Sequence, residues 1–330
     1  MNPIIEQSPT RVDLAGGTLD LWPLYNFIGG ATTVNIAINV YTKVTLIPRV
    51  DLVIEIESKD LKLKKQFKDL NSLLADSDIG LTLFKSVLKY WKPSKGFSLI
   101  SESQSPVGGG LGGSSSLTVS LMKAFAKWQG KTFKSTHELV HICHNLEAEV
   151  LNTPTGTQDY YPAASGGLNI LKYSASGIEQ QVLPVEKGEI LNSFLLVYTG
   201  KSHHSGMNNF EVVKSAVAKN PETMKYLLEL KNIAQETAEV CLKQNWSQLP
   251  ALFNREFQSR VKLAPAFTSP EIEKLQQISM QNGALAVKIC GAGGGGCVLV
   301  WTTPENLLKV SSACEKAGFH PMNAKPVGPI

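Results

Sequence analysis

The chain has 330 residues, of which 43% are hydrophobic and 18% are charged, and its formal net charge is +4. This composition excludes a disordered chain, and the length favours two domains that share a cleft. The densest basic run, residues 62–65, is followed by Asp69 and is expected to be a solvated face rather than a nucleic-acid surface.

No stretch approaches the roughly 20 apolar residues that cross a bilayer, and we expect no secretory signal at the N-terminus. The five cysteines contain no CxxC pair, which predicts reduced thiols rather than a structural zinc site. We therefore expect a cytoplasmic protein with neither a membrane nor a nucleic-acid partner.

Strand patterns dominate the first hundred residues. Over residues 32–58, β-branched residues alternate with polar ones, which predicts two or three antiparallel strands. Residues 96–100 predict another strand, which leads into a Gly/Ser run. From Ser114 the apolar residues recur at helical spacing, and Gly130 is a plausible end for this helix.

The second half alternates long helical patterns with short strands. A helix is expected over residues 135–150 and a strand over 166–171, followed by a largely helical stretch over 205–262 and a helix over 269–282. Two further strands, residues 284–289 and 298–301, flank a second glycine run. The pattern predicts an α+β fold with a boundary near residue 190, where residues 187–189 are the candidate hinge.

The Gly/Ser run, residues 105–116, is the strongest functional signal. Glycines allow close approach to a charged group, and the following helix supplies unpaired N–H groups and the positive end of its dipole. A flexible linker would not lead directly into an amphipathic helix. The run therefore predicts a phosphate-binding loop.

Common nucleotide fingerprints fit this loop poorly. Gly108, Gly110 and Gly113 satisfy GxGxxG, but no acidic residue stands about 20 positions later, and helix rather than strand follows. A Walker A motif also fails, because Leu195 occupies the position of the first glycine before Gly200.

Three motifs, in order along the chain, resemble the GHMP kinases (galactokinase, homoserine kinase, mevalonate kinase, phosphomevalonate kinase). They are residues 9–20, the Pro-x-Gly-x-Gly-Leu-Gly-x-Ser-Ser loop at 106–115, and the glycine-rich run at 288–296. The resemblance implies a two-domain GHMP kinase fold, with a ribosomal-S5-like N-terminal ATP-binding domain (1–190) and a ferredoxin-like C-terminal domain (191–330). ATP and a small-molecule substrate would bind between them.

The resemblance also implies roles for single residues. The ATP-binding loop would comprise Pro106, Gly108, Gly109, Gly110, Leu111, Gly112, Gly113, Ser114 and Ser115. The cofactors would be ATP and Mg²⁺, with the metal on Ser114 and Glu147. Glu149 is a rival for the second position, but the two point about 200° apart on a helix, so only one can face the cleft.

Asp159 is the expected catalytic residue, which would accept or orient the proton of the substrate hydroxyl. Without the resemblance, an aspartate that caps a turn would be the simpler interpretation. Arg11 matches the cation beside this aspartate and would stabilise negative charge during transfer.

The substrate itself would contact the first and third motifs and the turn around Asp159. The expected contacts are Asp20, Gly17, Thr18, Gly156, Asp159, Gly293 and Gly294. Lys201, His203 and His204 could line the cleft or be exposed loop residues, and their roles stay open.

Within the family, residues 14–20 and 154–160 look more like the heptose-7-phosphate kinase and fucokinase branch than like galactokinase. Tyr160 stands where Gln or Asn is usual, and Gly113 replaces the usual first serine. The resemblance implies an ATP-dependent sugar kinase that phosphorylates the anomeric hydroxyl, as a monomer or homodimer. The alternatives are a kinase of the mevalonate type and a non-catalytic nucleotide-binding relative.

Overall fold

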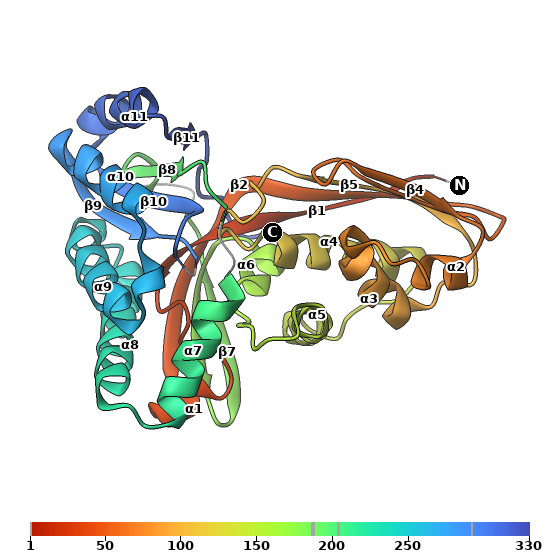
Figure 1. The fold of residues 1–330 in the computed structure, drawn as a ribbon, viewed down its shortest axis with the longest axis horizontal. Helices are drawn as coiled ribbons and strands as arrows, with labels where there is room; N and C mark the ends of the chain where they lie inside the picture. Colours follow the sequence, from red (N-terminus) through yellow and green to blue (C-terminus); the bar gives the residue numbers. More distant parts are fainter. Residues whose placement is uncertain (1, 186–188, 203–204, 292) are drawn as a thin grey trace.

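The computed structural model describes residues 2–185, 189–202, 205–291 and 293–330, which form two sheets with helices packed against them (Figure 1). Among these residues, the first sheet has seven strands in the order β4-β3-β5-β2-β6-β7, with β1 paired to β2. Its strands are β1 (Ile4–Ala15), β2 (Ala31–Pro48), β3 (Ile54–Ser58), β4 (Leu63–Phe67), β5 (Phe97–Ser103), β6 (Leu168–Ser174) and β7 (Gly177–Leu183).

The second sheet is antiparallel, with four described strands in the order β11-β8-β10-β9. They are β8 (Phe194–Tyr198), β9 (Ala284–Ile289), β10 (Cys297–Thr302) and β11 (His320–Met322). Two sheets with separate helix layers confirm the predicted α+β, two-domain fold.

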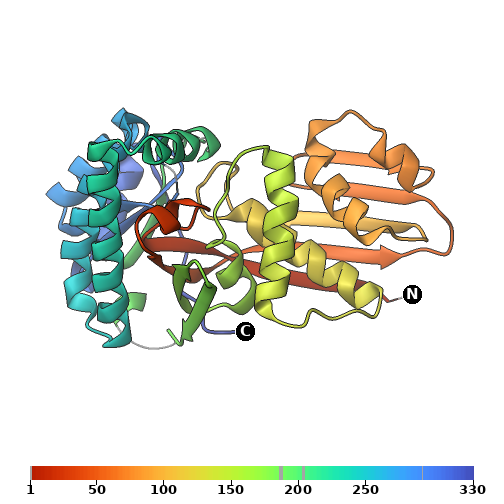
Figure 2. The ribbon, with the colours of Figure 1, turned by 90° about the horizontal axis from the view of Figure 1, so that it is seen from below.

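A layer of helices covers one side of the first sheet; it lies below the sheet in Figure 1 and is seen from beneath in Figure 2. The layer comprises α2 (Leu70–Leu74), α3 (Thr82–Trp91), α4 (Gly113–Trp128), α5 (Thr136–Leu151) and α6 (Tyr160–Ser165), and the short helix α1 (Leu24–Phe27) lies apart from it. The later helices are α7 (Ser205–Val217), α8 (Pro221–Leu242), α9 (Leu249–Leu263), α10 (Pro270–Gln281) and α11 (Leu307–Lys316). Helix α8 packs on both α9 and β2, so it joins the two units.

Local signals place the helix starts where the sequence predicts them. The side chains of Ser135 and Ser269 cap α5 and α10 by accepting hydrogen bonds from backbone N–H groups, and Pro221 begins α8. Each of these signals acts within one turn of helix, and the expected helices over 135–150 and 269–282 are confirmed.

The pairing of the early strands differs from the simplest expectation. Residues 32–58 do form two strands, β2 and β3, but these do not pair with each other. Both pair with β5, β2 antiparallel and β3 parallel. The 18-residue β2 is long enough to hold β5 and β6 along different parts of its length, and this leaves β3 beyond β5.

Residues 9–15 of the first motif belong to a strand, β1, whose second half is fully buried. It pairs antiparallel with β2, with irregularities after Pro9 and around Asp13. The sequence pattern predicts no strand there. The strand carries Arg11 and Asp13 into the space between the two sheets.

The proposed boundary near residue 190 falls between β7 and β8. Residues 187 and 188 of the candidate hinge lie outside the described residues. The last residues return to the first sheet, where the N–H of Val327 donates to the carbonyl of Ala37 at 2.9 Å. We therefore propose residues 1–190 and 191–330 as the two units. The C-terminal segment lies against the first unit.

Two further observations bear on expectations from composition. All five cysteines are unpaired and buried, as predicted for reduced thiols. Within the described part of the chain, none of the helices has both the length and the apolar character that a membrane span requires.

Candidate active site

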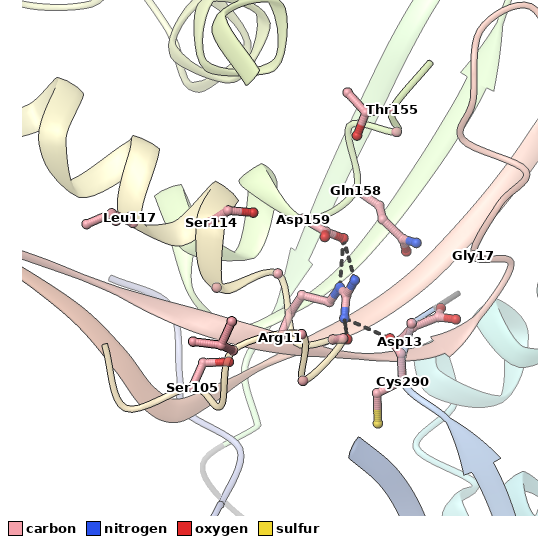
Figure 3. Close-up of a pocket in the computed structure, with 18 of the residues that line it drawn as sticks. Arg11, Asp13, Gly17, Ser105, Ser114, Leu117, Thr155, Gln158, Asp159 and Cys290 are labelled. Carbon is pink, nitrogen blue, oxygen red and sulfur yellow. Dashed lines mark hydrogen bonds and ion pairs between the residues drawn. The ribbon is translucent and has the colours of Figure 1, made fainter. Parts of the chain in front are cut away.

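The three motifs meet at one pocket of about 370 Å³ between the two sheets (Figure 3). Most of the predicted site residues line it. They are Arg11, Gly17, Thr18, Asp20, Pro106, Gly108, Gly109, Gly110, Gly112, Gly113, Ser114, Gly156 and Asp159.

The Gly/Ser loop adopts the conformation that its glycines permit. Gly108, Gly110 and Gly112 have φ angles of 66°, 71° and 70°, a left-handed region that other residues rarely adopt. Gly112 is the residue before α4, so the free N–H groups of this 16-residue helix open toward the pocket. The geometry suits a bound phosphate.

Backbone contacts fix the loop to both units. Leu111 does not line the pocket; it is buried, and its carbonyl accepts a hydrogen bond from the N–H of Arg11 at 3.0 Å. The carbonyl of Gly109 accepts one from the N–H of Cys297 on β10 at 2.7 Å. The loop is therefore clamped between β1 and the second sheet.

Arg11 and Asp159 form an ion pair at the centre of the pocket. The Asp159 Oδ1 atom lies 2.8 Å from Nε and 2.7 Å from Nη2 of Arg11. The Nη1 atom donates to the carbonyls of Gly110 and Cys290 at 2.7 and 2.8 Å. Burial opposes the charge of Arg11, but Asp159 and Asp13 outweigh it and raise the pKa of Arg11.

The geometry of Asp159 does not match a capping role. Asp159 precedes α6, yet its side chain makes no capping hydrogen bond. Its carboxylate lies against the Gly/Ser loop instead, since a Cβ added to Gly112 would be 3.0 Å from Oδ2. The carboxylate is 24% exposed and faces the pocket.

Glu147 lies behind the loop, in contact with its serines. The hydroxyl of Ser114 donates to Oε1 at 2.5 Å, and that of Ser115 donates to Oε2 at 3.0 Å. Burial raises the pKa of Glu147. Glu149, the rival, is 62% exposed and 4.0 Å from Lys89, so of the two only Glu147 approaches the pocket.

One carboxylate and one hydroxyl suit Mg²⁺, which takes its remaining ligands from phosphate oxygens and water. No cluster of three or more His, Cys, Asp or Glu side chains able to hold a metal occurs among the described residues. A metal held by Glu147 and Ser114 would therefore depend on the phosphates of a bound nucleotide.

Asp20 lines the pocket next to Gln158. It is buried, and its Oδ2 atom accepts a hydrogen bond from the N–H of Gln158 at 3.0 Å. Gly156 packs against it, because an added Cβ would meet the same oxygen. Burial raises the pKa of Asp20 to about 6.

A buried ionic cluster, which the sequence does not predict, contacts the pocket residue Gly17. Lys288 donates to Oδ2 of Asp13 at 2.8 Å and lies 3.5 Å from Glu256, which is paired with Arg260. Arg260 also donates to the carbonyl of Gly17 at 2.9 Å. The cluster joins the first motif on β1 to helix α9 and strand β9.

Other predicted residues lie apart from the pocket lining. Ser115 is buried behind the loop. Gly293 and Gly294 do not line the pocket; Gly293 packs against the backbone of Phe267, and Cys290 and Gly291 of the same motif line it instead. Their contact with a substrate stays a prediction. Lys201 pairs with Glu271 on the surface, and His203 and His204 lie outside the described residues.

Several pocket residues are not predicted from the sequence. The apolar side chains Leu61, Leu83, Val107 and Leu117 line the pocket. Gln158 also lines it and is adjacent to Asp159 in the chain. Arg260 is one of only four arginines, and that scarcity was the available signal for it.

Comparison with known proteins agrees with the resemblance. Models described as GHMP kinases N terminal domain and GHMP kinases C terminal match residues 81–167 and 237–320. A Campylobacter jejuni protein named D-glycero-alpha-D-manno-heptose 7-phosphate kinase is 27% identical over 96% of this chain and 94% of its own length. A mevalonate kinase of Thermococcus onnurineus is also 27% identical, over 82% of this chain and 83% of its own length.

A solved structure has the same fold. A solved D-glycero-D-manno-heptose 1-phosphate kinase from Bacteroides thetaiotaomicron superposes with a TM-score of 0.78 at 21% identity, covering 98% of this chain and 96% of that one. The two matched domains identify the protein as a member of the GHMP kinase family.

Proposed function

We propose that this protein is an ATP-dependent kinase that transfers the γ-phosphate to a hydroxyl of a sugar or sugar phosphate, at the anomeric position. The observation that carries the proposal is the position of Asp159. Its carboxylate binds Arg11 and faces Gly112 so closely that an added Cβ there would lie 3.0 Å from Oδ2. A proton acceptor therefore lies directly beside the loop that would hold the phosphates.

The pocket provides for both substrates. Its lining includes Leu61, Leu83, Val107 and Leu117, which offer an apolar surface for a nucleobase. The loop and the start of α4 then face the phosphates. Mg²⁺, when bound, would neutralise charge on the phosphate oxygens, and Ser114 and Glu147 are the residues that would hold it.

Each central side chain has a definite task in this proposal. Asp159 accepts the proton of the attacking hydroxyl as the O–P bond forms and the bond from phosphorus to the leaving ADP oxygen breaks. Arg11 holds the carboxylate in place and offers positive charge where negative charge develops. Asp20 accepts a hydrogen bond from another hydroxyl of the sugar and so orients the sugar that receives the phosphate.

Unpartnered oxygens favour a polyhydroxylated acceptor. The Oδ1 atom of Asp13 and the Oε1 atom of Gln158 are buried without a hydrogen-bond partner among the described residues, and both side chains line the pocket. Buried polar atoms of this kind are normally satisfied. Hydroxyls of a sugar could donate to them and to Asp20, whereas the carboxylate of mevalonate would meet the acidic side chains of Asp13 and Asp20.

A substrate panel tests the proposal. Purified protein would be given ATP, Mg²⁺ and, in turn, free hexoses and heptoses, their terminal phosphates, and mevalonate, and ADP release would be followed. We expect turnover with a sugar or sugar phosphate, and a ³¹P–¹H coupling to the anomeric proton in the product. Turnover with mevalonate alone would establish the isoprenoid alternative, and ATP binding without any turnover would establish the non-catalytic one.

A further inference from the structure

Tyr160 occupies a position that neither the resemblance nor the proposed function explains. It is the first residue of α6, directly after Asp159, and its side chain is completely buried. The family usually has an amide side chain there. A buried tyrosine hydroxyl needs a hydrogen-bond partner, and the partner here is Glu147, with Oη 2.5 Å from Oε2.

The hydroxyl completes a set of three donors around one carboxylate. Tyr160 and Ser115 both donate to Oε2 of Glu147, at 2.5 and 3.0 Å. Among the described residues, Oε1 receives only the hydroxyl of Ser114, which lines the pocket. The two donors on Oε2 therefore fix the plane of the carboxylate and leave Oε1 facing the side from which a metal would approach.

The chain position of Tyr160 links two functional groups. Glu147 belongs to α5, whereas Asp159 and Tyr160 belong to the start of α6. The Tyr160 hydroxyl bridges these elements, so the carboxylate behind the loop and the carboxylate beside it are held by one short segment. The ring of His144 packs edge-on against Tyr160, with centroids 6.2 Å apart, and restricts its position.

We propose that Tyr160 is a positioning residue for the metal-binding carboxylate: its hydroxyl holds Oε2 of Glu147 so that Oε1 and Ser114 face Mg²⁺. This inference rests on the proposed function, because it takes Glu147 and Ser114 as the metal ligands. Residues that orient a ligand without touching the metal commonly change metal affinity about 10- to 100-fold when they are replaced.

The neighbouring residue provides a matched control. Tyr161 is 1% exposed, and its hydroxyl lies 2.8 Å from Nδ1 of His137, away from Glu147. Tyr160→Phe and Tyr161→Phe each remove one buried hydroxyl from the same short helix. Only the first removes a donor from Glu147.

The measurement is the Mg²⁺ dependence of ATP binding. MgCl₂ is titrated at a fixed ATP concentration, and ATP binding is measured by calorimetry or by the rise in melting temperature. For Tyr160→Phe we expect the half-saturating Mg²⁺ concentration to rise about tenfold, with ATP binding in EDTA unchanged. Tyr161→Phe should behave like the wild type. Equal shifts in both variants, or no shift in Tyr160→Phe, would overturn the proposal.

A second variant covers the case in which Tyr160→Phe folds poorly. Ser115→Ala removes the other donor to Oε2 without altering the aromatic core, and should shift the Mg²⁺ dependence in the same direction. An unchanged Mg²⁺ dependence in this variant would contradict the orientation of Glu147 on which the proposal depends. Because these readouts need no acceptor, a Mg²⁺ shift without sugar turnover would refute the proposed function and leave the role of Tyr160 standing.

Discussion

Asp159 is the residue on which the proposed chemistry depends most directly. Asn is nearly isosteric and can still accept a hydrogen bond from Arg11, but it cannot take up the hydroxyl proton at neutral pH. We predict that Asp159→Asn lowers kcat at least a hundredfold, within the usual range of about 10²–10⁴ for a general base, while ATP affinity and folding stay close to wild type. Steady-state kinetics and a denaturant melt check this, and a kcat within threefold of wild type would remove Asp159 from the mechanism.

Burial makes the ionised form of Asp20 unfavourable when no substrate is bound. Burial raises its pKa from 3.8 to about 6, so the folded state binds more protons than the unfolded state between about pH 4 and 6. Stability contributed by this group is therefore lost as the pH rises through that window, by an amount on the order of 3 kcal/mol.

We predict that Asp20→Asn removes this loss, since an amide does not ionise and can still accept from the N–H of Gln158. Urea melts of both proteins at pH 4.5 and pH 7.5 give the comparison. Relative to the wild type, the variant should be more stable at the higher pH, while its KM for the acceptor rises. Parallel pH profiles for the two proteins would show that Asp20 is not the group that titrates.

The Gly/Ser loop depends on backbone conformation as much as on side chains. At Gly112 a Cβ is disfavoured both by φ of +70° and by Asp159 at 3.0 Å. Gly130, beyond the other end of α4, has φ of +65° but open space around it. Gly112→Ala and Gly130→Ala thus impose a similar backbone strain, about 1–2 kcal/mol, at opposite ends of one helix.

We predict that only Gly112→Ala weakens ATP binding and lowers kcat, because only there does the new methyl group displace the phosphate loop or Asp159. Thermal protection by Mg·ATP measures the first effect. If both variants lost the same protection, general destabilisation would explain it, and the loop would have no special part in nucleotide binding.

The two sheets are held together by charges buried between them. Asp13 comes from the first sheet, and Lys288, Glu256 and Arg260 come from the second unit; each is at most 3% exposed. Burial opposes the charge on Asp13, but Lys288 and Arg260 hold its pKa below the ordinary value. Removing one cation would leave its partners uncompensated in the interior.

We predict that Lys288→Met costs about 3–5 kcal/mol of unfolding free energy. Arg255→Met, on α9, breaks an ion pair with Glu236 in which both side chains are about half exposed, and should cost at most about 1 kcal/mol. Denaturant melts of the two variants test this difference. A Lys288→Met protein as stable as Arg255→Met would show that the cluster does not join the units.

Much of the architecture was readable from the chain because it rests on local physics. Helix starts at Ser135 and Ser269 follow from capping, and the conformation of the Gly/Ser loop follows from glycines placed before a helix. The motif order identified the family, and with it the convergence of Arg11 and Asp159.

Tertiary structure decided what depends on groups far apart in sequence. The order of the strands in the first sheet is one case, because β3 and β2 both pair with β5 and alternating residues do not specify a neighbour. The ionic cluster is another, since Lys288 and Asp13 are 275 positions apart. The hydroxyl of Tyr160 finds Glu147 only because α6 packs against α5. Local patterns fix backbone conformation. The partner of a buried charge or hydroxyl is set by tertiary packing, and the sequence alone does not show which distant residues come into contact.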